Sequence, residues 1–269
     1  MRQRMAVPTL FFLLMVILAI PVLLSGCSAK AGAQPDGNLP VLVIGSDEYE
    51  PFNYADDDGN YVGVDVELAQ EACRRMGYQP EFRQVVWEKK DEYLTNGEVD
   101  CLWGCFSMNG REELYTWAGP YMDSRQVVVV RVDSDLHKLS DLEGKRVAVQ
   151  ATGKAESILL QRTDPQVPEV GAVYCLSTLE ELFAALRKSY CDAIAGHEAA
   201  LQYYMDLAPE QYRVLDEKIY ISHVGVAFLK GTHTGLAAQL TQTLDDMAAD
   251  GTIAEIAAKY HVQAAGGNA

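Results

Sequence analysis

The sequence feature that most constrains the fold is an alternation of short apolar, β-branched runs with segments of helical periodicity. Runs at residues 41–45, 82–86 and 99–103 predict strands, and residues 65–76 and 87–94 between them predict helices. The order strand, helix, strand, helix, strand is typical of α/β folds, in which helices cover a mostly parallel sheet. This part of the chain therefore predicts an α/β fold.

The first predicted helix has identifiable ends and one apolar side. Asp65 is expected at its N-cap, where a carboxylate can accept hydrogen bonds from free backbone N–H groups. Val66, Ala69 and Cys73 recur at helical spacing, which predicts that they face the core. Gly77 is expected to end the helix at the C′ position.

The same alternation starts again in the second half of the chain. Strands are predicted at residues 146–150, 172–176 and 192–195. Before the last of these, Ser177 and Glu180 are expected to form a capping box that opens another helix. Two sets of similar units predict two α/β lobes, each with a mixed, mostly parallel sheet.

Two long apolar, β-rich segments at residues 126–132 and 219–229 fit neither set. We expect them to be crossover strands that join the lobes and act as a hinge. This interpretation places the first lobe at residues 41–126, the second at 127–221, and the C-terminal part of the first at 222–269.

The N-terminus has the pattern of a removed targeting segment. Residues 1–26 contain a short basic region followed by a long apolar run, which is typical of a secretory signal. The junction Leu24-Ser25-Gly26-Cys27 resembles a bacterial lipobox, in which the cysteine receives a lipid. Residues 27–40, rich in Pro, Gly and Ala, predict a flexible tether. An N-terminal membrane-spanning helix is the alternative.

Charge and cysteine content exclude several functions. The chain has 22 Lys and Arg against 38 Asp and Glu, a net charge of −16, which argues against nucleic-acid binding. If Cys27 carries lipid, the remaining odd number of cysteines cannot all pair, so a disulfide scaffold is not expected. Cys101 and Cys105 are predicted to be small buried residues on a strand. No metal-ligand spacing or cofactor-binding motif occurs.

The residues that follow the strand at 99–103 suggest an anion site. Ser107 comes just after this strand, and Arg111 is expected to open a short acidic helix near the same sheet edge. Ligands of α/β sheets bind beyond the carboxyl ends of the strands, and arginine offers a two-pronged donor to a carboxylate. The alternative is a surface ion pair between Arg111 and Glu112 or Glu113.

Five stretches resemble extracytoplasmic solute-binding proteins of amino-acid ABC transporters, the bacterial family 3. They are the aromatic-x-Pro-Phe loop at 47–54, the Gly-x-Asp-x-Glu-Leu helix start at 63–68, the Arg to Pro-Tyr run at 111–121, the Asp-Leu-x-Gly-Lys-x-Val run at 141–149, and the closing helix at 250–260. The resemblance implies a two-lobe clamp of the periplasmic-binding-protein type.

The resemblance also implies where the ligand binds. The α-carboxylate would meet Arg111 and Ser107 and, across the cleft, backbone N–H groups at a helix start near Gly153 and Lys154. Such helix starts bind anions well. The loop before Arg111 is shorter than is usual in the family, which leaves its register open.

The rest of the implied site would hold the ammonium and the side chain. Tyr49 and Trp87 match aromatic residues that enclose the ligand side chain, and the carbonyl near Cys105 would accept from the ammonium. The family's second-lobe acid corresponds to His197 in a gapless match, with Glu198 one residue beyond. Both stay candidates, and Glu198 has the better chemistry for an ammonium.

The implied function is a lipid-anchored extracytoplasmic receptor, a monomer without cofactor, that hands an amino acid to an ABC permease. The acids near the expected side-chain end favour a polar or cationic ligand; they are Asp47, Glu48, Glu50 and Glu88. A dehydratase on the same fold is one alternative, but it needs a placed general acid. A sensor domain is another, and it would need a membrane helix after the domain.

We predict that Cys27 is lipidated, because it directly follows the lipobox-like residues. The full-length chain expressed in a bacterium should fractionate with membranes and carry the added mass of the lipid. Cys27→Ala should lose both properties, whereas Cys175→Ala, outside the motif, should keep them. Equal mass and membrane retention for Cys27→Ala and the unchanged chain would contradict lipidation.

Overall fold

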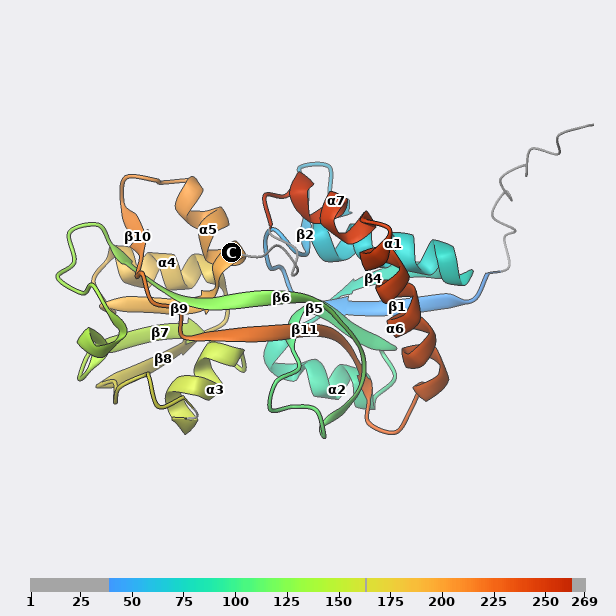
Figure 1. The fold of residues 1–269 in the computed structure, drawn as a ribbon, viewed down its shortest axis with the longest axis horizontal. Coiled ribbons are helices and arrows are strands. Elements are labelled where there is room, and N and C mark those ends of the chain that lie inside the picture. The colour runs from blue at the N-terminus through green and yellow to red at the C-terminus, as the bar shows by residue number, and fades with distance from the viewer. Residues whose placement is uncertain (1–38, 163, 263–269) are drawn as a thin grey trace, which may run out of the picture. The chain divides into compact units, whose positions relative to one another are not determined.

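The computed structural model describes residues 39–162 and 164–262, and Figure 1 shows their fold. The predicted signal segment, Cys27 and nearly all of the predicted tether lie outside these residues. The strands are β1 (Val41–Ser46), β2 (Tyr54–Ala55), β3 (Tyr61–Val62), β4 (Gln79–Gln84), β5 (Cys101–Ser107), β6 (Tyr115–Arg131), β7 (Arg146–Gln150), β8 (Ala172–Leu176), β9 (Ala193–His197), β10 (Tyr212–Val214) and β11 (Tyr220–Leu229).

The helices alternate with these strands, which confirms the predicted α/β fold. They are α1 (Val64–Met76), α2 (Lys90–Thr95), α3 (Lys154–Gln161), α4 (Leu179–Arg187), α5 (Glu198–Asp206), α6 (Thr234–Ala249) and α7 (Thr252–Lys259). Two short 3₁₀ helices, η1 (Trp87–Lys89) and η2 (Leu139–Leu142), complete the set.

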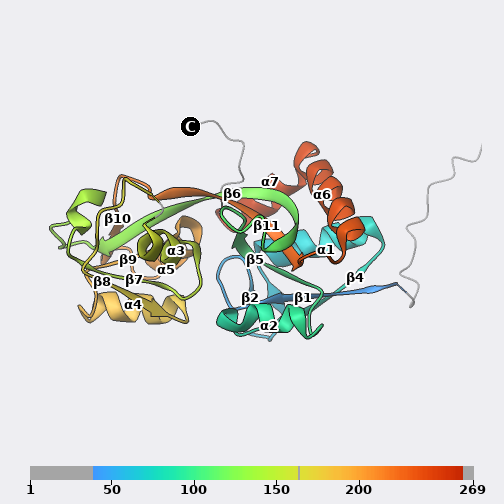
Figure 2. The same cartoon turned by 90° about the horizontal axis from the view of Figure 1, so that it is seen from below.

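Nine strands form one mixed sheet in the order β4-β1-β5-β11-β6-β9-β7-β8, with β10 paired to β6. Strands β4, β1 and β5 pair in parallel at one end, and β9, β7 and β8 pair in parallel at the other. We call these the first and second halves of the sheet. The long strands β6 and β11 pair antiparallel and run from one half to the other, as Figures 1 and 2 show.

Helices cover both faces of the sheet. A large apolar cluster on one face takes side chains from α1, α4, α5, α6 and α7. The opposite face is covered by η1 and α2 in the first half and by η2 and α3 in the second. Figure 1 shows α2 and α3 on the side of the sheet opposite α1 and α4. The two halves are the two predicted lobes, while the exact domain boundaries stay a prediction.

Several predicted elements match closely. The strands predicted at 146–150 and 172–176 have the observed bounds of β7 and β8, and Gly77 caps α1 in the left-handed conformation. The segment predicted as a crossover from residue 126 belongs to a much longer strand, β6, which begins at Tyr115. Its alternating buried and exposed residues before Gln126 pair with β11, so the strand continues back into the first half.

Other predicted bounds were wrong by a few residues. The strand expected at 82–86 is β4, which ends at Gln84, and the strand expected at 99–103 is β5, which begins at Cys101. The helix expected to start with a box of Ser177 and Glu180 has its capping box one residue later. There the Thr178 hydroxyl accepts from the Glu181 N–H, and the Glu181 carboxylate accepts from the Thr178 N–H.

Asp65 is not the N-cap of α1, because the helix begins at Val64 and Gly63 occupies the cap. The Asp65 side chain is 1 % exposed and points into the core. Its Oδ2 accepts from the Cys105 N–H at 2.7 Å and its Oδ1 from the Tyr121 hydroxyl at 2.8 Å. A carboxylate that has these internal donors does not need the free N–H groups of the first helical turn.

The start of α1 is fixed by the preceding loop. The Val64 and Asp65 N–H groups donate to the Pro51 and Phe52 carbonyls at 3.0 Å. Gly63 has a φ of +125°, and a Cβ there would lie 2.2 Å from the Phe52 carbonyl oxygen. Only glycine allows this close approach.

We predict that Gly63→Ala lowers the free energy of unfolding by about 3 kcal/mol, because strain and a backbone clash combine. Gly59→Ala is the matched control: its φ is +81°, but nothing lies within 4 Å of its Cβ position. It should cost only about 1 kcal/mol of strain. Urea unfolding of both variants measures the difference, and equal losses would contradict the clash.

Candidate functional site

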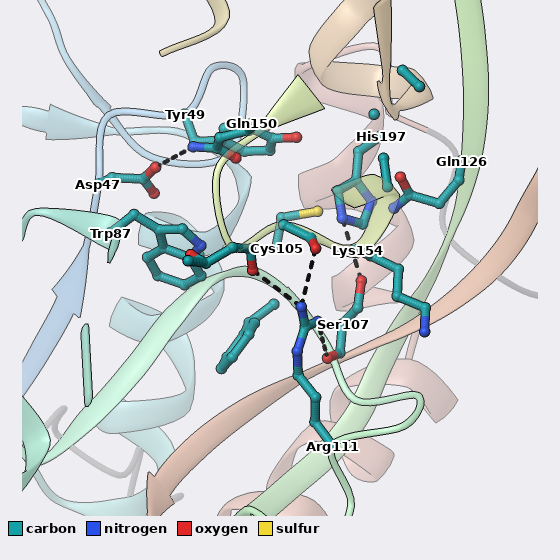
Figure 3. A pocket seen from close by; sticks show the side chains of 17 residues that line it. Asp47, Tyr49, Trp87, Cys105, Ser107, Arg111, Gln126, Gln150, Lys154 and His197 are labelled. Carbon is teal, nitrogen blue, oxygen red and sulfur yellow. Dashed lines mark hydrogen bonds between the residues drawn. The ribbon is translucent and has the colours of Figure 1, made fainter. Parts of the chain in front are cut away.

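A pocket lies where strand ends from both halves of the sheet meet (Figure 3). Nine of the ten predicted ligand-binding residues line it: Asp47, Tyr49, Trp87, Cys105, Ser107, Arg111, Gly153, Lys154 and His197. They come from the loop after β1, from η1, from the end of β5 and the turn beyond it, from the β7–α3 turn, and from the end of β9. Segments far apart in the sequence therefore form one site, although the binding role of each residue stays a prediction.

Glu198 does not line this pocket. Its carboxylate forms an ion pair with the Arg125 guanidinium at 3.3 Å. His197, one residue earlier, ends β9 and faces the pocket. The gapless match to the resembled family is thus the one that the geometry favours.

Arg111 lies in a turn, so the short acidic helix expected there was wrong. The backbone N–H of Arg111 donates to the Met108 carbonyl and closes a turn. The Asn109-Gly110 pair lies inside this turn, and both residue types favour turns over a helix start. The turn directs the guanidinium into the pocket, as Figure 3 shows. The alternative, an ion pair with Glu112 or Glu113, does not form, because no ion pair within the described ranges includes Arg111.

The Arg111 guanidinium bridges the two halves. Nη1 donates to the Ser107 carbonyl at 3.1 Å, and Nη2 donates to the Thr152 carbonyl at 3.1 Å and the Gly153 carbonyl at 3.2 Å. The guanidinium carbon lies 5.2 Å from the centre of the Phe106 ring. Burial lowers the pKa of Arg111 from its usual value, yet arginine keeps its charge in proteins. The pocket therefore holds a half-buried cation.

The start of α3 faces this cation. Helix α3 begins at Lys154, and its N-cap Gly153 has no side chain to accept from the first N–H groups. The N–H groups of a first helical turn have no partner within the helix, and they attract anions. Lys154 and Ala155 of this turn both line the pocket. Arg111 and the start of α3 together form a site suited to a carboxylate.

The Asp65 carboxyl holds the end of β5 in place beside this site. Cys105, whose N–H donates to Asp65, has a φ of +48°, a conformation that residues other than glycine rarely adopt. Burial raises the pKa of Asp65 to about 7. The left-handed backbone at Cys105, inside β5, sets the direction of the chain toward Ser107 and hence toward Arg111.

Aromatic rings form one wall of the pocket. Trp87 packs edge-on against Phe106, with ring centres 5.1 Å apart, and Tyr49 packs edge-on against His197 at 6.2 Å. Lys90 is 5 % exposed, lies over the Trp87 ring, and donates to the Thr152 hydroxyl at 2.9 Å. The rings are supported from behind and need little reordering to pack against a ligand.

Among the described residues, Asp47 is the one carboxyl group in the lining of the pocket. Its Oδ2 accepts from Gln150 Nε2 of the other half at 2.7 Å. Burial raises the pKa of Asp47 to about 7, against the opposing effect of this hydrogen bond. The Asp47 carboxyl therefore exists in both protonation states near neutral pH.

The other acids once expected near the ligand side chain lie outside the lining. Glu88 accepts from the Ser177 hydroxyl at 2.6 Å, and Glu50 accepts from the Tyr204 hydroxyl at 3.0 Å. Glu48 is exposed. Only Asp47 remains as an acid that could face a ligand side chain.

His197 lies between two serine hydroxyls. Its Nδ1 is 2.8 Å from Ser124 Oγ, and its Nε2 is 3.4 Å from Ser107 Oγ. Burial, followed by the charge of Arg111, lowers the pKa of His197 to about 3. The imidazole is therefore neutral at physiological pH.

Several lining residues were not among the predicted site residues, including Phe106, Gln126 and Gln150. Gln126 is fully buried, although it stands directly before four valines. This polar residue at the start of an apolar run was the signal that could have identified Gln126 as a site residue. Phe106 gave no signal, because its role below Arg111 follows from packing between distant segments.

Other chemistries have no counterpart in the described residues. No group of three or more metal-ligating side chains occurs there. Cys73, Cys101, Cys105, Cys175 and Cys191 are all free thiols, and Cys101 and Cys105 are buried on β5 as expected. Among the described helices, none has the length and apolarity needed to span a membrane.

Residues 41–263 match the family profile of bacterial extracellular solute-binding proteins, family 3. One similar relative is the L-cystine-binding protein TcyA of Bacillus subtilis, with 25% identity over 223 residues that cover 82% of this chain and 81% of TcyA.

Solved structures agree with this family match. The crystal structure of Tv2483 bound to L-arginine has a TM-score of 0.75 and 27% identity, and the match covers 82% of this chain and 90% of Tv2483. An ancestral amino acid-binding protein described as a precursor of cyclohexadienyl dehydratase has a TM-score of 0.71 and 24% identity over 82% of this chain and 95% of that protein. The latter likeness shows the shared fold alone.

We predict that Arg111→Ala weakens binding of the best amino-acid ligand by about a hundredfold or more, because a buried ligand carboxylate would lose a charged two-pronged donor. Arg111→Lys should recover only part of this loss, since an ammonium lacks the planar fork. Calorimetric titration beside melting curves measures both effects.

The matched control for Arg111 is Arg74→Ala on the surface of α1, whose side chain is 70 % exposed. It should bind as the unchanged chain does. Wild-type affinity in Arg111→Ala would contradict the carboxylate assignment. A collapsed melting temperature in that variant would instead make Arg111 a structural residue.

Proposed function

Because the chain belongs to the bacterial extracellular solute-binding proteins of family 3, we propose that it is a lipid-anchored, extracytoplasmic receptor that captures an amino acid between its two lobes and delivers it to an ABC permease. The observation that carries this proposal is the half-buried Arg111 guanidinium facing the start of α3. These two donors to an anion come from different halves of the sheet and meet in one pocket.

An amino acid fits the chemistry of this pocket. Its carboxylate would bind Arg111 and the first N–H groups of α3, which replace the hydrogen bonds that water supplies. The aromatic rings of Tyr49 and Trp87 would cover the side chain. Both rings are already buried, so the pocket is largely organised before the ligand arrives.

The lobes have to separate before a ligand can bind. The pocket encloses about 30 Å³, which is room for about two water molecules on the usual scale of 10–15 Å³ each. Polar contacts close it between the halves: Gln150 to Asp47, Lys90 to Thr152, and Ser177 to Glu88. A ligand that touches both halves would favour the closed state over the open one.

Delivery without chemical change distinguishes this receptor from an enzyme on the same fold. A dehydratase needs a general acid at the reacting end of its substrate. His197 is neutral, and the Asp47 carboxyl is the single acid in the lining, where it accepts a hydrogen bond from Gln150. We therefore infer binding, by a monomer without cofactor, and expect the ligand to be recovered unchanged after incubation.

We predict that at least one of the twenty proteinogenic amino acids or L-cystine stabilises the full-length protein in detergent. At a concentration of about 100 times Kd, the melting temperature should rise by about 5–10 °C. A solubilised Cys27→Ala chain should show a smaller radius of gyration with saturating ligand in small-angle scattering, because the lobes close.

Arg111→Ala at the same ligand concentration is the control and should show neither change. If no compound of the panel raised the melting temperature, the proposed function would be wrong. If a compound bound calorimetrically but left the radius of gyration unchanged, lobe closure would be wrong.

A further inference from the structure

Gln126 has an unsatisfied acceptor in the pocket. Its side chain is fully buried in β6, at the position where β6 pairs with His197 of β9 and Tyr220 of β11. The Gln126 Nε2 donates to the Ser222 hydroxyl at 3.2 Å, while Oε1 has no hydrogen-bond partner among residues 39–162 and 164–262. Figure 3 shows the amide directed toward His197. Buried amide oxygens nearly always have a donor, so this one is available to a ligand.

The groups around Gln126 carry no charge. His197 is neutral, and its two ring nitrogens lie beside the hydroxyls of Ser124 and Ser107. Glu198, which directly follows His197, is paired with Arg125 and does not line the pocket. A donor group of the ligand would therefore meet neutral acceptors at this end.

The charged groups of the pocket are more positive than negative. Lys154 is buried and Arg111 is half-buried, and neither takes part in an ion pair of the described residues. The Lys154 Nζ donates to the Asn109 carbonyl at 3.1 Å and lies over the Tyr220 ring. Lys90, also buried, adds a third positive charge behind Trp87. Against these cations the lining offers only the Asp47 carboxyl.

This distribution of charge limits the net charge of the ligand. A zwitterion brings one carboxylate for Arg111 and one ammonium, so it leaves the charge of the closed pocket unchanged. A cationic side chain would add a further positive charge to a buried site that already contains unpaired cations. Buried charges without an opposite partner are strongly disfavoured.

We propose that the pocket excludes amino acids with a cationic side chain, and that Gln126 Oε1 accepts a hydrogen bond from the ligand ammonium. This inference rests on the proposed function and narrows its substrate class to amino acids whose side chain carries no positive charge. It excludes arginine and lysine, although a similar solved structure holds L-arginine.

The first test ranks the twenty proteinogenic amino acids by calorimetry at pH 7.5 on the full-length protein in detergent. The strongest binder should have no cationic side chain and should bind about tenfold or more tightly than L-arginine and L-lysine. A strongest binder with a cationic side chain would overturn the proposal. If no amino acid bound, the proposed function itself would fail, which is a different outcome.

The second test changes Gln126. Gln126→Met, similar in length but without a carbonyl, should weaken the strongest binder by about tenfold. Gln126→Glu, which adds a carboxylate, should raise the affinity for L-arginine relative to that for L-citrulline, its uncharged counterpart. Gln239→Met on the exposed face of α6 is the control and should change nothing. Unchanged binding by a folded Gln126→Met variant would remove Gln126 from the site.

Discussion

The site depends on one buried carboxyl group, that of Asp65. It accepts from the Cys105 N–H, the Tyr121 hydroxyl and the Asn53 amide, and so joins α1 to β5, to β6 and to the loop after β1. Each of these segments carries or precedes residues that line the pocket. The carboxyl group is costly to bury, and its three donors offset that cost only because the segments are held together. The network thus organises the first half of the sheet before any ligand is present.

Arg111 extends this organisation to the second half. Within the described residues its guanidinium forms no ion pair. It donates instead to carbonyl groups on both sides of the pocket. A cation held by neutral dipoles keeps its attraction for an anion, whereas a salt bridge would already have satisfied it. His197 and Gln126 differ from Arg111 because they are neutral. They can accept hydrogen bonds from a ligand without adding charge to the pocket.

Local patterns in the sequence predicted local structure well. The bounds of β7 and β8 and the cap at Gly77 follow from apolar runs and from glycine, which act within a few residues. Asp65 was misplaced because its donors lie 40 and 56 residues away in the chain. The resemblance to a known family placed nine of ten site residues around one pocket, but Gln126 was missed. Its free acceptor becomes visible only when β6, β9 and β11 lie side by side.

The paired strands β6 and β11 have a mechanical consequence. Antiparallel pairing joins them from Leu229 and Tyr115 at one end to Tyr220 and Gln126 at the other, with one register shift between Val224 and Val226. Such a ribbon resists shear between its strands, because sliding would break many bonds of the ladder at once, while bending perpendicular to its plane breaks few. If the two halves separate as the proposed function requires, we expect their motion to follow close to a single degree of freedom. The free energy of ligand contact would then act along one coordinate, with little lost to sideways motion of the lobes.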